Sequence, residues 1–433
     1  MSPVKIAVIG AGSFVFGPSI LSQIIFENDL GEIELALMDI DPEIVRLIAV
    51  IGRQMARESH KSVRISTHME RVPALEGADY VICSAATEAR QRYQMDSDII
   101  QQHIPGHQVT EFGGVAGISY SLRQIALITA IAEDMKRCCP DALLLNVANP
   151  LPRVCQAAHA SGIRTVGFCS VALNAHNFLW QILRDRPPLK YPFTEAIKRW
   201  HMTTAGLNHF AWVLELVDRH THEDLLPQIR RRIAGGATSR NPLTEAVCME
   251  TGYFLATGDT HVRDFLEPRH PLPEPHEPFH GDDEERWNRL QQMRLIADGE
   301  EEWQTLLRQV SWERPVDFIA ARVTGKPFNF RALNLVNEGQ MPDLPNGVFV
   351  ETPCEVCADG IQPQTIRLPQ SVLHLTRRTA QVTDTIVRAA LTRSRALLTE
   401  AIELDPTIED KAAGQRALDA CLSVHSDLLP AYS

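Results

Sequence analysis

The first forty residues constrain the fold most, because they have the pattern of a strand, a glycine turn and a helix. The β-branched run 4–9 leads into Gly10-Ala11-Gly12-Ser13, and an apolar periodic stretch follows at 18–25. Glycines in such a turn permit a tight bend and let backbone N–H groups approach a pyrophosphate at the helix N-terminus. The pattern is imperfect, since Val15 stands where GxGxxG has its last glycine.

The position of this turn strengthens the prediction of a dinucleotide site. A second apolar strand, 33–38, ends at Asp39, where a carboxylate would bind ribose hydroxyls. NAD is therefore the predicted cofactor, and a purely structural glycine turn is the alternative. The predicted cofactor-binding residues are Gly10, Gly12, Ser13, Phe14 and Asp39.

Strands and helices alternate through the first 170 residues. Further strands are predicted at 63–66, 79–83, 142–147 and 164–168, with a long helix over 120–135. This alternation is typical of an α/β fold with a Rossmann-type, doubly wound parallel sheet. The pattern is less regular afterwards and includes a last helical block over 376–404. We therefore expect a nucleotide-binding domain over 1–170 and an α+β lobe over 171–433.

Composition narrows the class of protein. The net charge of −12 argues against a nucleic-acid or anionic-membrane surface, so neither partner is expected. Nine scattered cysteines suit reduced thiols, and the first residues lack the pattern of a signal peptide. No uninterrupted apolar run has membrane-spanning length. The predicted location is the cytoplasm.

Polar side chains follow two neighbouring strands of the predicted sheet. Asn149 ends the strand that contains Leu143, and Cys169 ends the next strand along the chain. The carboxyl ends of parallel strands lie at the edge where open α/β sheets bind ligands. Each residue also has a simpler interpretation, a strand-ending turn for Asn149 and a small buried hydrophobe for Cys169.

Two later segments carry further candidates. Gly206-Leu207-Asn208-His209 places an imidazole beside an amide, although His209 alone could be a core histidine. Gly258-Asp259-Thr260-His261, near Tyr253, could supply a general base. A thiolate and an imidazole together predict a two-ligand metal site that leaves positions open for substrate.

Together, these segments resemble glycoside hydrolase family 4, the NAD- and divalent-metal-dependent glycosidases on a lactate/malate-dehydrogenase-like scaffold. The resemblance covers most of the chain, with the motifs in family order. They are the N-terminal GxGS, Asn146 to Pro150, Gly167 to Cys169, Gly206 to His209, and a C-terminal signature at 337–340, 344–346 and 350–353. The pattern is most similar to the α-glucosidase and α-galacturonidase branch.

The resemblance implies roles for the candidate residues. Cys169 and His209 would hold a divalent ion, usually manganese in this family, although ligand softness alone would favour zinc. Asn149 would contact the sugar near its 2- and 3-hydroxyls. Further substrate-binding candidates are Asn208, Arg90 and His261, and the last two are also candidates for an ordinary surface or salt-bridge role.

The implied reaction is a transient oxidation. Hydride passes from C3 of the sugar to NAD, a base removes the acidified C2 proton, and the glycosidic oxygen leaves by elimination. Water then adds and the hydride returns to C3, so that no net redox change results. Asp259 is the first choice for the base and Tyr253 the second.

Two departures from the family pattern concern catalysis. The residue after the metal-binding cysteine is often His or Asp in relatives, whereas here it is Ser170, a poor acid at neutral pH. His176, His261 or a metal-bound water could replace it. The segment 113–119 also differs from the Gly-Pro-Gly-Gly-like loop of relatives, so substrate contacts there are expected to differ.

The segment after Asn149 bears on whether the substrate implied by the resemblance is phosphorylated. Leu151-Pro152 stands where the phosphosugar-specific branch has Ala-Gly, which favours a non-phosphorylated α-glycoside or a uronide. A homodimer or homotetramer is implied by family habit. The alternatives are an NAD-dependent 2-hydroxyacid or sugar dehydrogenase and a catalytically silent sensor of sugar or nucleotide.

Overall fold

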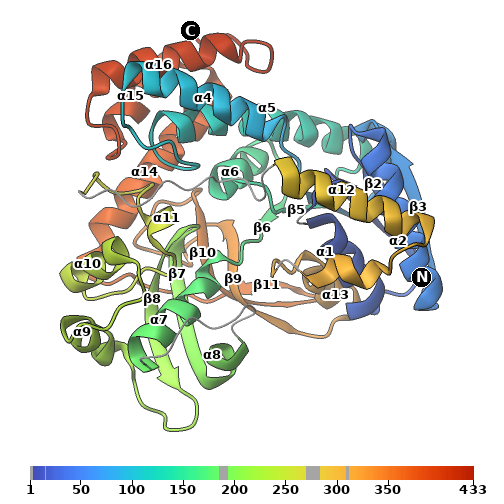
Figure 1. Ribbon diagram of the computed structural model, residues 1–433, viewed down its shortest axis with the longest axis horizontal. Coiled ribbons are helices and arrows are strands. Elements are labelled where there is room, and N and C mark those ends of the chain that lie inside the picture. Colours follow the sequence, from blue (N-terminus) through green and yellow to red (C-terminus); the bar gives the residue numbers. More distant parts are fainter. Residues whose placement is uncertain (1–2, 15, 185–193, 270–282, 309–311) are drawn as a thin grey trace.

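The computed structural model describes residues 3–14, 16–184, 194–269, 283–308 and 312–433 (Figure 1). The N-terminal half forms the predicted parallel sheet in the order β3-β2-β1-β4-β5-β6. Its strands are β1 (Val4–Ile9), β2 (Ile33–Met38), β3 (Val63–His68), β4 (Tyr80–Cys83), β5 (Leu143–Asn146) and β6 (Thr165–Gly167). The crossovers place β1 beside both β2 and β4, and this is the doubly wound arrangement.

The helix α2 begins where the sequence provides both a cap and a proline. Asp41 caps α2 by accepting hydrogen bonds from the backbone N–H groups of Glu43 and Ile44 at 2.9 and 3.1 Å, and Pro42 occupies its first turn. The helices of this half are α1 (Phe16–Ser22) with the π-helical η1 (Gln23–Glu27), α2 (Pro42–Glu58), α3 (Arg71–Leu75), α4 (Ala89–His103), α5 (Gly114–Cys138) and α6 (Leu151–Ala160).

The second half extends the same sheet instead of forming a separate one. The strand β9 (Phe328–Val336) pairs antiparallel with β6, and the order continues through β10 (Phe349–Cys357), β7 (Trp200–Leu207) and β8 (Phe210–Asp218). The short β11 (Gly360–Pro363) pairs with β10. The predicted α/β fold with an α+β lobe is confirmed, and its two parts share one continuous sheet of 11 strands.

The helices of the second half pack against both halves of the protein. They are α7 (Asn174–Arg184), α8 (Thr194–Arg199), α9 (Leu226–Ala234), α10 (Pro242–Thr251), α11 (Asp259–Val262), α12 (Asp283–Asp298), α13 (Pro315–Thr324), α14 (Gln370–Thr392), α15 (Arg395–Leu404) and α16 (Lys411–Val424), with 3-10 turns η2 (Val171–Leu173) and η3 (Trp303–Arg308). The helical block predicted over 376–404 is present as α14 and α15, and the chain between them turns at Arg393, where φ is 56°. A further helix, α16, follows this block. Figure 1 shows α4, α5, α15 and α16 gathered at one end.

The longest helix in the described part of the chain is a core element. The helix α5 is long and apolar enough to cross a membrane, but 78% of its most apolar stretch is buried inside the protein. The helix α5 packs against α3, α6, α14 and α16, and its apolar side chains belong to two hydrophobic clusters of the core. Burial against these helices accounts for the apolar composition of α5 without a membrane.

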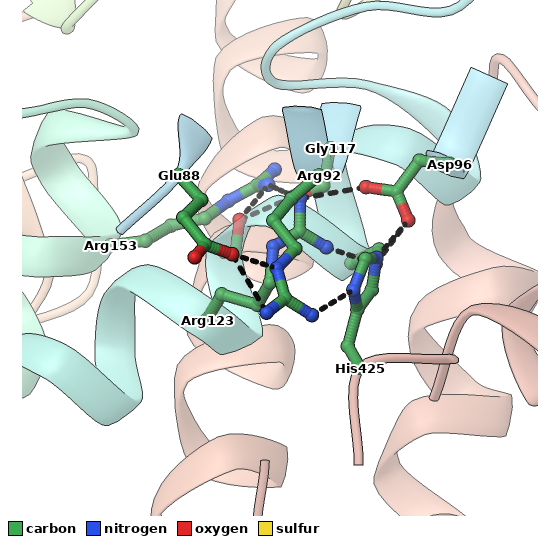
Figure 2. Close-up of polar contacts among 9 residues, drawn as sticks. Glu88, Arg92, Asp96, Gly117, Arg123, Arg153 and His425 are labelled. Atoms are coloured by element: carbon green, nitrogen blue, oxygen red, sulfur yellow. Dashed lines mark hydrogen bonds and ion pairs between the residues drawn. The ribbon is translucent and has the colours of Figure 1, made fainter. Parts of the chain in front are cut away.

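A buried polar cluster fixes α5 against α4 and α16 (Figure 2). Asp96 is fully buried and accepts hydrogen bonds from Arg123 at 2.7 Å and from His425 at 2.8 Å. Arg153 of α6 donates to the carbonyl oxygen of Gly117 at 3.1 Å. Because a buried charge is costly unless it is paired or hydrogen-bonded, this cluster specifies how these helices pack against one another.

Candidate functional site

The predicted metal ligands come from two distant parts of the chain. Cys169 follows β6, and His209 lies in the two-residue turn between β7 and β8. The Sγ atom of Cys169 is 3.5 Å from Nε2 of His209. Both side chains lie at the edge where β6 ends, so the structure brings together the pair that the sequence singled out.

This pair has the chemistry of a metal site. The donor atoms are close enough for a single ion to bind both, because metal–sulfur and metal–nitrogen bonds are about 2.0–2.3 Å long. Burial holds the pKa of His209 well below its usual range, so that the imidazole is neutral and can act as a ligand. Among the described residues, no cluster of three or more His, Cys, Asp or Glu side chains forms a metal site. A bound ion would therefore keep open positions.

The tight turn that carries His209 depends on its glycine. Gly206 has a φ of 151°, and a Cβ atom there would lie 2.6 Å from the carbonyl oxygen of Phe210. His209 itself has a φ of 61°, a conformation that is uncommon for a residue with a side chain. The Thr257 hydroxyl donates to the carbonyl oxygen of His209 at 3.1 Å. Strain of this kind persists where surrounding contacts hold it and is frequent at functional sites.

Glu351 supports the turn from within the protein. Its Oε2 atom accepts hydrogen bonds from the amides of Asn208 and Asn334, each at 3.0 Å. All three residues are fully buried, and burial raises the pKa of the Glu351 carboxyl. The structure therefore places Asn208 behind the Cys169–His209 pair, and its predicted substrate contact stays a prediction. The sequence motif contained Glu351 but did not reveal this contact.

Asn149 faces an acidic group that sequence analysis missed. The amide of Asn149 donates to Oε2 of Glu111 at 3.2 Å. Burial, with the nearby Asp264, raises the pKa of Glu111 to about 8. Burial also raises the pKa of Asp264, to about 7, and this carboxyl accepts a hydrogen bond from the backbone N–H of Phe112. No motif marks either residue, since the contact of Glu111 with Asn149 and that of Asp264 with Phe112 exist only in the folded chain.

These two carboxyls predict a pH-dependent stability. In the folded state each carboxyl keeps a proton that it loses in the unfolded chain above about pH 4.5. Their contribution to the free energy of unfolding is therefore fully present below that pH. It is lost as pH rises towards 8, the folded pKa of Glu111. The free energy of unfolding should fall across this window by at most about 1.4 kcal/mol per pH unit for each group.

Urea unfolding of the wild type and of Glu111→Gln between pH 5 and 8.5 measures this effect. We expect a smaller pH slope in the variant, because the amide does not titrate. Glu284→Gln, at an exposed position on α12, is the matched control and should keep the wild-type slope. Equal slopes in all three proteins would contradict the placement of Glu111.

Asp259 lies at the N-terminus of α10 in the folded chain. Its Oδ1 atom accepts hydrogen bonds from the backbone N–H and the hydroxyl of Thr244, both at 2.8 Å, and Oδ2 accepts one from the N–H of Leu243 at 2.9 Å. A carboxylate offers about four acceptor positions, so Oδ2 keeps one. These hydrogen bonds hold the carboxylate of Asp259 in one orientation. Its role as a base stays a prediction.

The capping contacts of Asp259 predict a measurable stability effect. Asp259→Ala should lower the free energy of unfolding by about 1–2 kcal/mol, the usual loss for a removed cap. Asp410→Ala is the control, since Asp410 caps α16 by accepting a hydrogen bond from Ala413 at 2.8 Å. Denaturant titration should show similar losses in both variants, and only Asp259→Ala should also lose catalytic activity. Full activity in Asp259→Ala would remove it as the base.

His261 lies within the same group of residues as His209. Their ring centroids are 4.4 Å apart, and the ring of Phe112 is 4.5 Å from that of His209. Tyr253 is half-buried against the hydrophobic cluster that contains Phe112, and its backbone N–H is hydrogen-bonded to Thr251. The structure thus brings His261 to the predicted metal ligands and places Tyr253 in the adjoining cluster.

Ser170 and His176, the positions considered for the acid, and Arg90, a candidate substrate residue, each have a partner within the protein. Ser170 donates hydrogen bonds from its backbone N–H and its hydroxyl to Oε1 of Glu313, at 2.9 and 2.7 Å. His176 is fully buried, and burial lowers its pKa to about 4. At neutral pH this imidazole is uncharged, and its remaining N–H is too weakly acidic to protonate a leaving group. Arg90 pairs with Asp283 at the start of α12, at 2.9 Å.

The glycine loop has the geometry that a dinucleotide requires. A Cβ atom on Gly12 would lie 2.4 Å from Ile44 and 2.8 Å from Asp39, so no side chain fits there. Asp39 accepts a hydrogen bond from the N–H of Gly12 at 2.8 Å, and Ser13 accepts one from Gly17. The ring of Phe14 lies beneath the guanidinium of Arg286, at 5.3 Å. This loop therefore fits a pyrophosphate that approaches the start of α1.

Comparison with known proteins decides the family. The family 4 glycosyl hydrolase model matches residues 5–185, and the model of that family's C-terminal domain matches residues 204–408. The chain belongs to the family 4 glycosyl hydrolases. The resemblance inferred from the sequence motifs is thereby confirmed, and with it the class of enzyme, a glycosidase.

This glycosyl hydrolase matches relatives over their full length. It is 27% identical to an alpha-galactosidase of Bacillus subtilis, with 99% of each chain covered, and 26% identical to an alpha-galacturonidase of the same organism, with 94% of each covered. Two solved structures share the fold. They are lplD, a glucosidase candidate from Bacillus subtilis (TM-score 0.82, 24% identity, 97% and 100% covered), and a 6-phospho-alpha-glucosidase from gut microorganisms with NAD and Mn2+ (TM-score 0.79, 20% identity, 100% of each covered).

Proposed function

We propose that this family 4 glycosyl hydrolase cleaves a non-phosphorylated α-glycoside or α-uronide with the help of NAD and a divalent ion, manganese. The observation that carries the proposal is the 3.5 Å contact between Cys169 and His209 at the sheet edge that also holds Asn149. The full-length matches to an alpha-galactosidase and an alpha-galacturonidase support the substrate class. The solved 6-phospho-alpha-glucosidase with NAD and Mn2+ supports the cofactors.

The two bound groups would supply a hydride acceptor for C3 of the sugar and a Lewis acid for the oxygen on that carbon. Gly10, Gly12 and Asp39 would hold the dinucleotide, and Cys169 and His209 would hold the ion.

The chain's own side chains would then orient the sugar and move its protons. Asn149, held by Glu111 at 3.2 Å, would hydrogen-bond the hydroxyls next to C3. Asp259 would remove the C2 proton through the acceptor position that remains on Oδ2, and Tyr253 is the second candidate for that base. His261 and Arg90 remain the candidates to bind a uronate carboxylate. Arg90 would have to exchange Asp283, an exposed partner, for the substrate.

The remaining features of the proposal concern the assembly. We assign NAD binding to the domain over residues 1–170, and substrate binding, metal binding and oligomerisation to the lobe over residues 171–433, with Asn149 and Cys169 contributed by the first domain. We place the protein in the cytoplasm as a homodimer or homotetramer. The nine cysteines are free thiols in the folded chain, which suits a reducing compartment. Sedimentation of the purified protein tests the assembly.

A panel of nitrophenyl α- and β-galactosides, glucosides and galacturonides, assayed with NAD, Mn2+ and a thiol, tests the function. We expect hydrolysis of an α-linked member with no lasting absorbance of NADH. Stoichiometric NADH would instead indicate a sugar or 2-hydroxyacid dehydrogenase. Binding of NAD and sugar without turnover would indicate a sensor. Either result would overturn the proposed function.

A further inference from the structure

The cofactor-binding residues assigned above account for the pyrophosphate and one ribose of NAD but not for its adenine ring. Gly10 and Gly12 would face the pyrophosphate, and Asp39 would bind the hydroxyls of the ribose that carries adenine. Adenine is bonded directly to this ribose, so it must lie close to Asp39. The next residue, Ile40, is 72% exposed, more than any other large apolar side chain that the structure describes. An uncovered apolar surface therefore adjoins the expected position of adenine.

A helix from the second half of the chain lies over this part of the nucleotide-binding domain (Figure 1). The helix α12 packs beside α2, with Met293 and Ile296 buried in the apolar core. Arg286 lies two turns before Met293 on the same side of α12, but it is exposed. Its guanidinium lies over the ring of Phe14 in the glycine loop, at 5.3 Å. The N-terminal end of α12 therefore extends beyond the core and over the glycine loop.

Trp287 is an exposed aromatic residue at this end of α12. Its side chain is 57% exposed, and the guanidinium of Arg294 lies over its ring at 5.6 Å. Arg294 in turn pairs with both carboxylate oxygens of Glu43, at 2.8 and 2.9 Å. Glu43 lies in the first turn of α2, three residues after Ile40. These contacts hold Trp287 on the side of the nucleotide loop where β2 ends.

An aromatic ring that is held in place and yet exposed is suited to a flat ligand. Nucleobases stack on aromatic side chains, and the large surface of a tryptophan makes it effective in such contacts. Because Arg294 and Glu43 already hold Trp287, little side-chain freedom would be lost when a base binds. Ile40 offers an apolar surface on the nucleotide-binding domain for the opposite face of the base.

We propose that Trp287 and Ile40 enclose the adenine ring of NAD, so that α12 of the second half completes the cofactor site of the first. This inference rests on the proposed function, because it takes the binding of NAD at the glycine loop as given. Trp287 would bind the adenine end of the cofactor, away from the nicotinamide that reacts with the sugar. It is therefore a cofactor-binding residue and not a catalytic one.

Binding of the two halves of NAD, measured separately by isothermal titration calorimetry, tests the proposal. ADP-ribose contains adenine without nicotinamide, and nicotinamide mononucleotide contains nicotinamide without adenine. In Trp287→Ala, the affinities for NAD and ADP-ribose should fall by the same factor, about 5- to 150-fold, the usual contribution of a stacked base. The affinity for nicotinamide mononucleotide should not change. Trp287→Phe keeps an aromatic ring and should recover most of the lost affinity.

Two further variants complete the test. Ile40→Ala removes the apolar contact on the opposite face and should weaken ADP-ribose binding about threefold or more. Phe328→Ala is the matched control, because Phe328 is 39% exposed on β9 and is also held by another side chain, Phe330, at 4.7 Å between ring centroids. Its affinities for all three ligands should equal those of the wild type.

The outcomes separate the role of Trp287 from the proposed function. Unchanged ADP-ribose affinity in Trp287→Ala, or an equal loss for nicotinamide mononucleotide, would overturn the adenine contact. A changed sedimentation coefficient with unchanged ADP-ribose affinity would also overturn it, by showing that a second copy of the chain covers Trp287. If Trp287→Ala fails to fold, Ile40→Ala decides by the same comparison of ligands. A wild-type protein that binds no NAD, or hydrolyses glycosides without it, would overturn the proposed function itself, independently of Trp287.

Discussion

Cys169→Ser and His209→Ala should each lose at least about a thousandfold in NAD-dependent hydrolysis. A Lewis acid contributes several kcal/mol to such a step, and each 1.4 kcal/mol corresponds to a factor of ten. The two proposed ligands lie 3.5 Å apart, and we expect that the single donor left after the loss of either would not retain the ion. Manganese content after dialysis, measured beside the hydrolysis rate, checks both parts of the prediction.

A matched cysteine separates metal binding from general damage. Cys357 is half-buried in β10 and is also a free thiol, so Cys357→Ser should keep full activity and metal content. Thermal unfolding of all three variants checks that they are folded. A Cys169→Ser or His209→Ala protein that is folded, binds manganese as the wild type does and remains active would refute the assignment of these ligands.

Gly12→Val should abolish NAD binding and, with it, hydrolysis. A Cβ atom at this position would lie 2.4 Å from the side chain of Ile44 and 2.8 Å from that of Asp39, so a valine must shift these side chains or the loop that we propose faces the pyrophosphate. Since the cofactor accepts the hydride in the first chemical step, we expect at least about a hundredfold weaker NAD binding. Titration of the intrinsic tryptophan fluorescence with NAD measures the affinity.

Gly235→Ala is the control for this substitution. A Cβ atom there meets nothing closer than 3.4 Å, and the residue ends α9 far from the loop in sequence. We expect unchanged NAD affinity in this variant. Gly12→Val that is folded and binds NAD normally would contradict the position of the cofactor, whereas loss of NAD binding with hydrolysis intact would contradict its participation in the reaction.

The sequence predicted those parts of the site that depend on strand order. Parallel strands end at a common edge, so Asn149 after β5 and Cys169 after β6 could be placed together from local patterns alone. Gly10, Gly12 and Asp39 followed from the first two strands in the same way. His209 joined them through a family motif, since nothing local indicates that the β7–β8 turn reaches the end of β6.

The groups that support these residues could not be predicted. Glu111, Glu313 and Glu351 come from a loop before α5, a segment before α13 and a buried strand, and each meets its partner only through tertiary packing. The continuous sheet has the same origin, because β9 reaches β6 after 160 intervening residues. Periodicity describes one element at a time and carries no information about such pairings.

Solvent deuterium at C2 tests the central claim most directly. The wild-type holoenzyme is incubated in deuterium oxide with NAD, Mn2+ and its α-glycoside, and the released sugar is examined by NMR spectroscopy. Oxidation at C3 followed by elimination predicts deuterium at C2 of the product, with NAD required in catalytic amount and no net NADH. Released sugar that carries only hydrogen at C2 would contradict the mechanism.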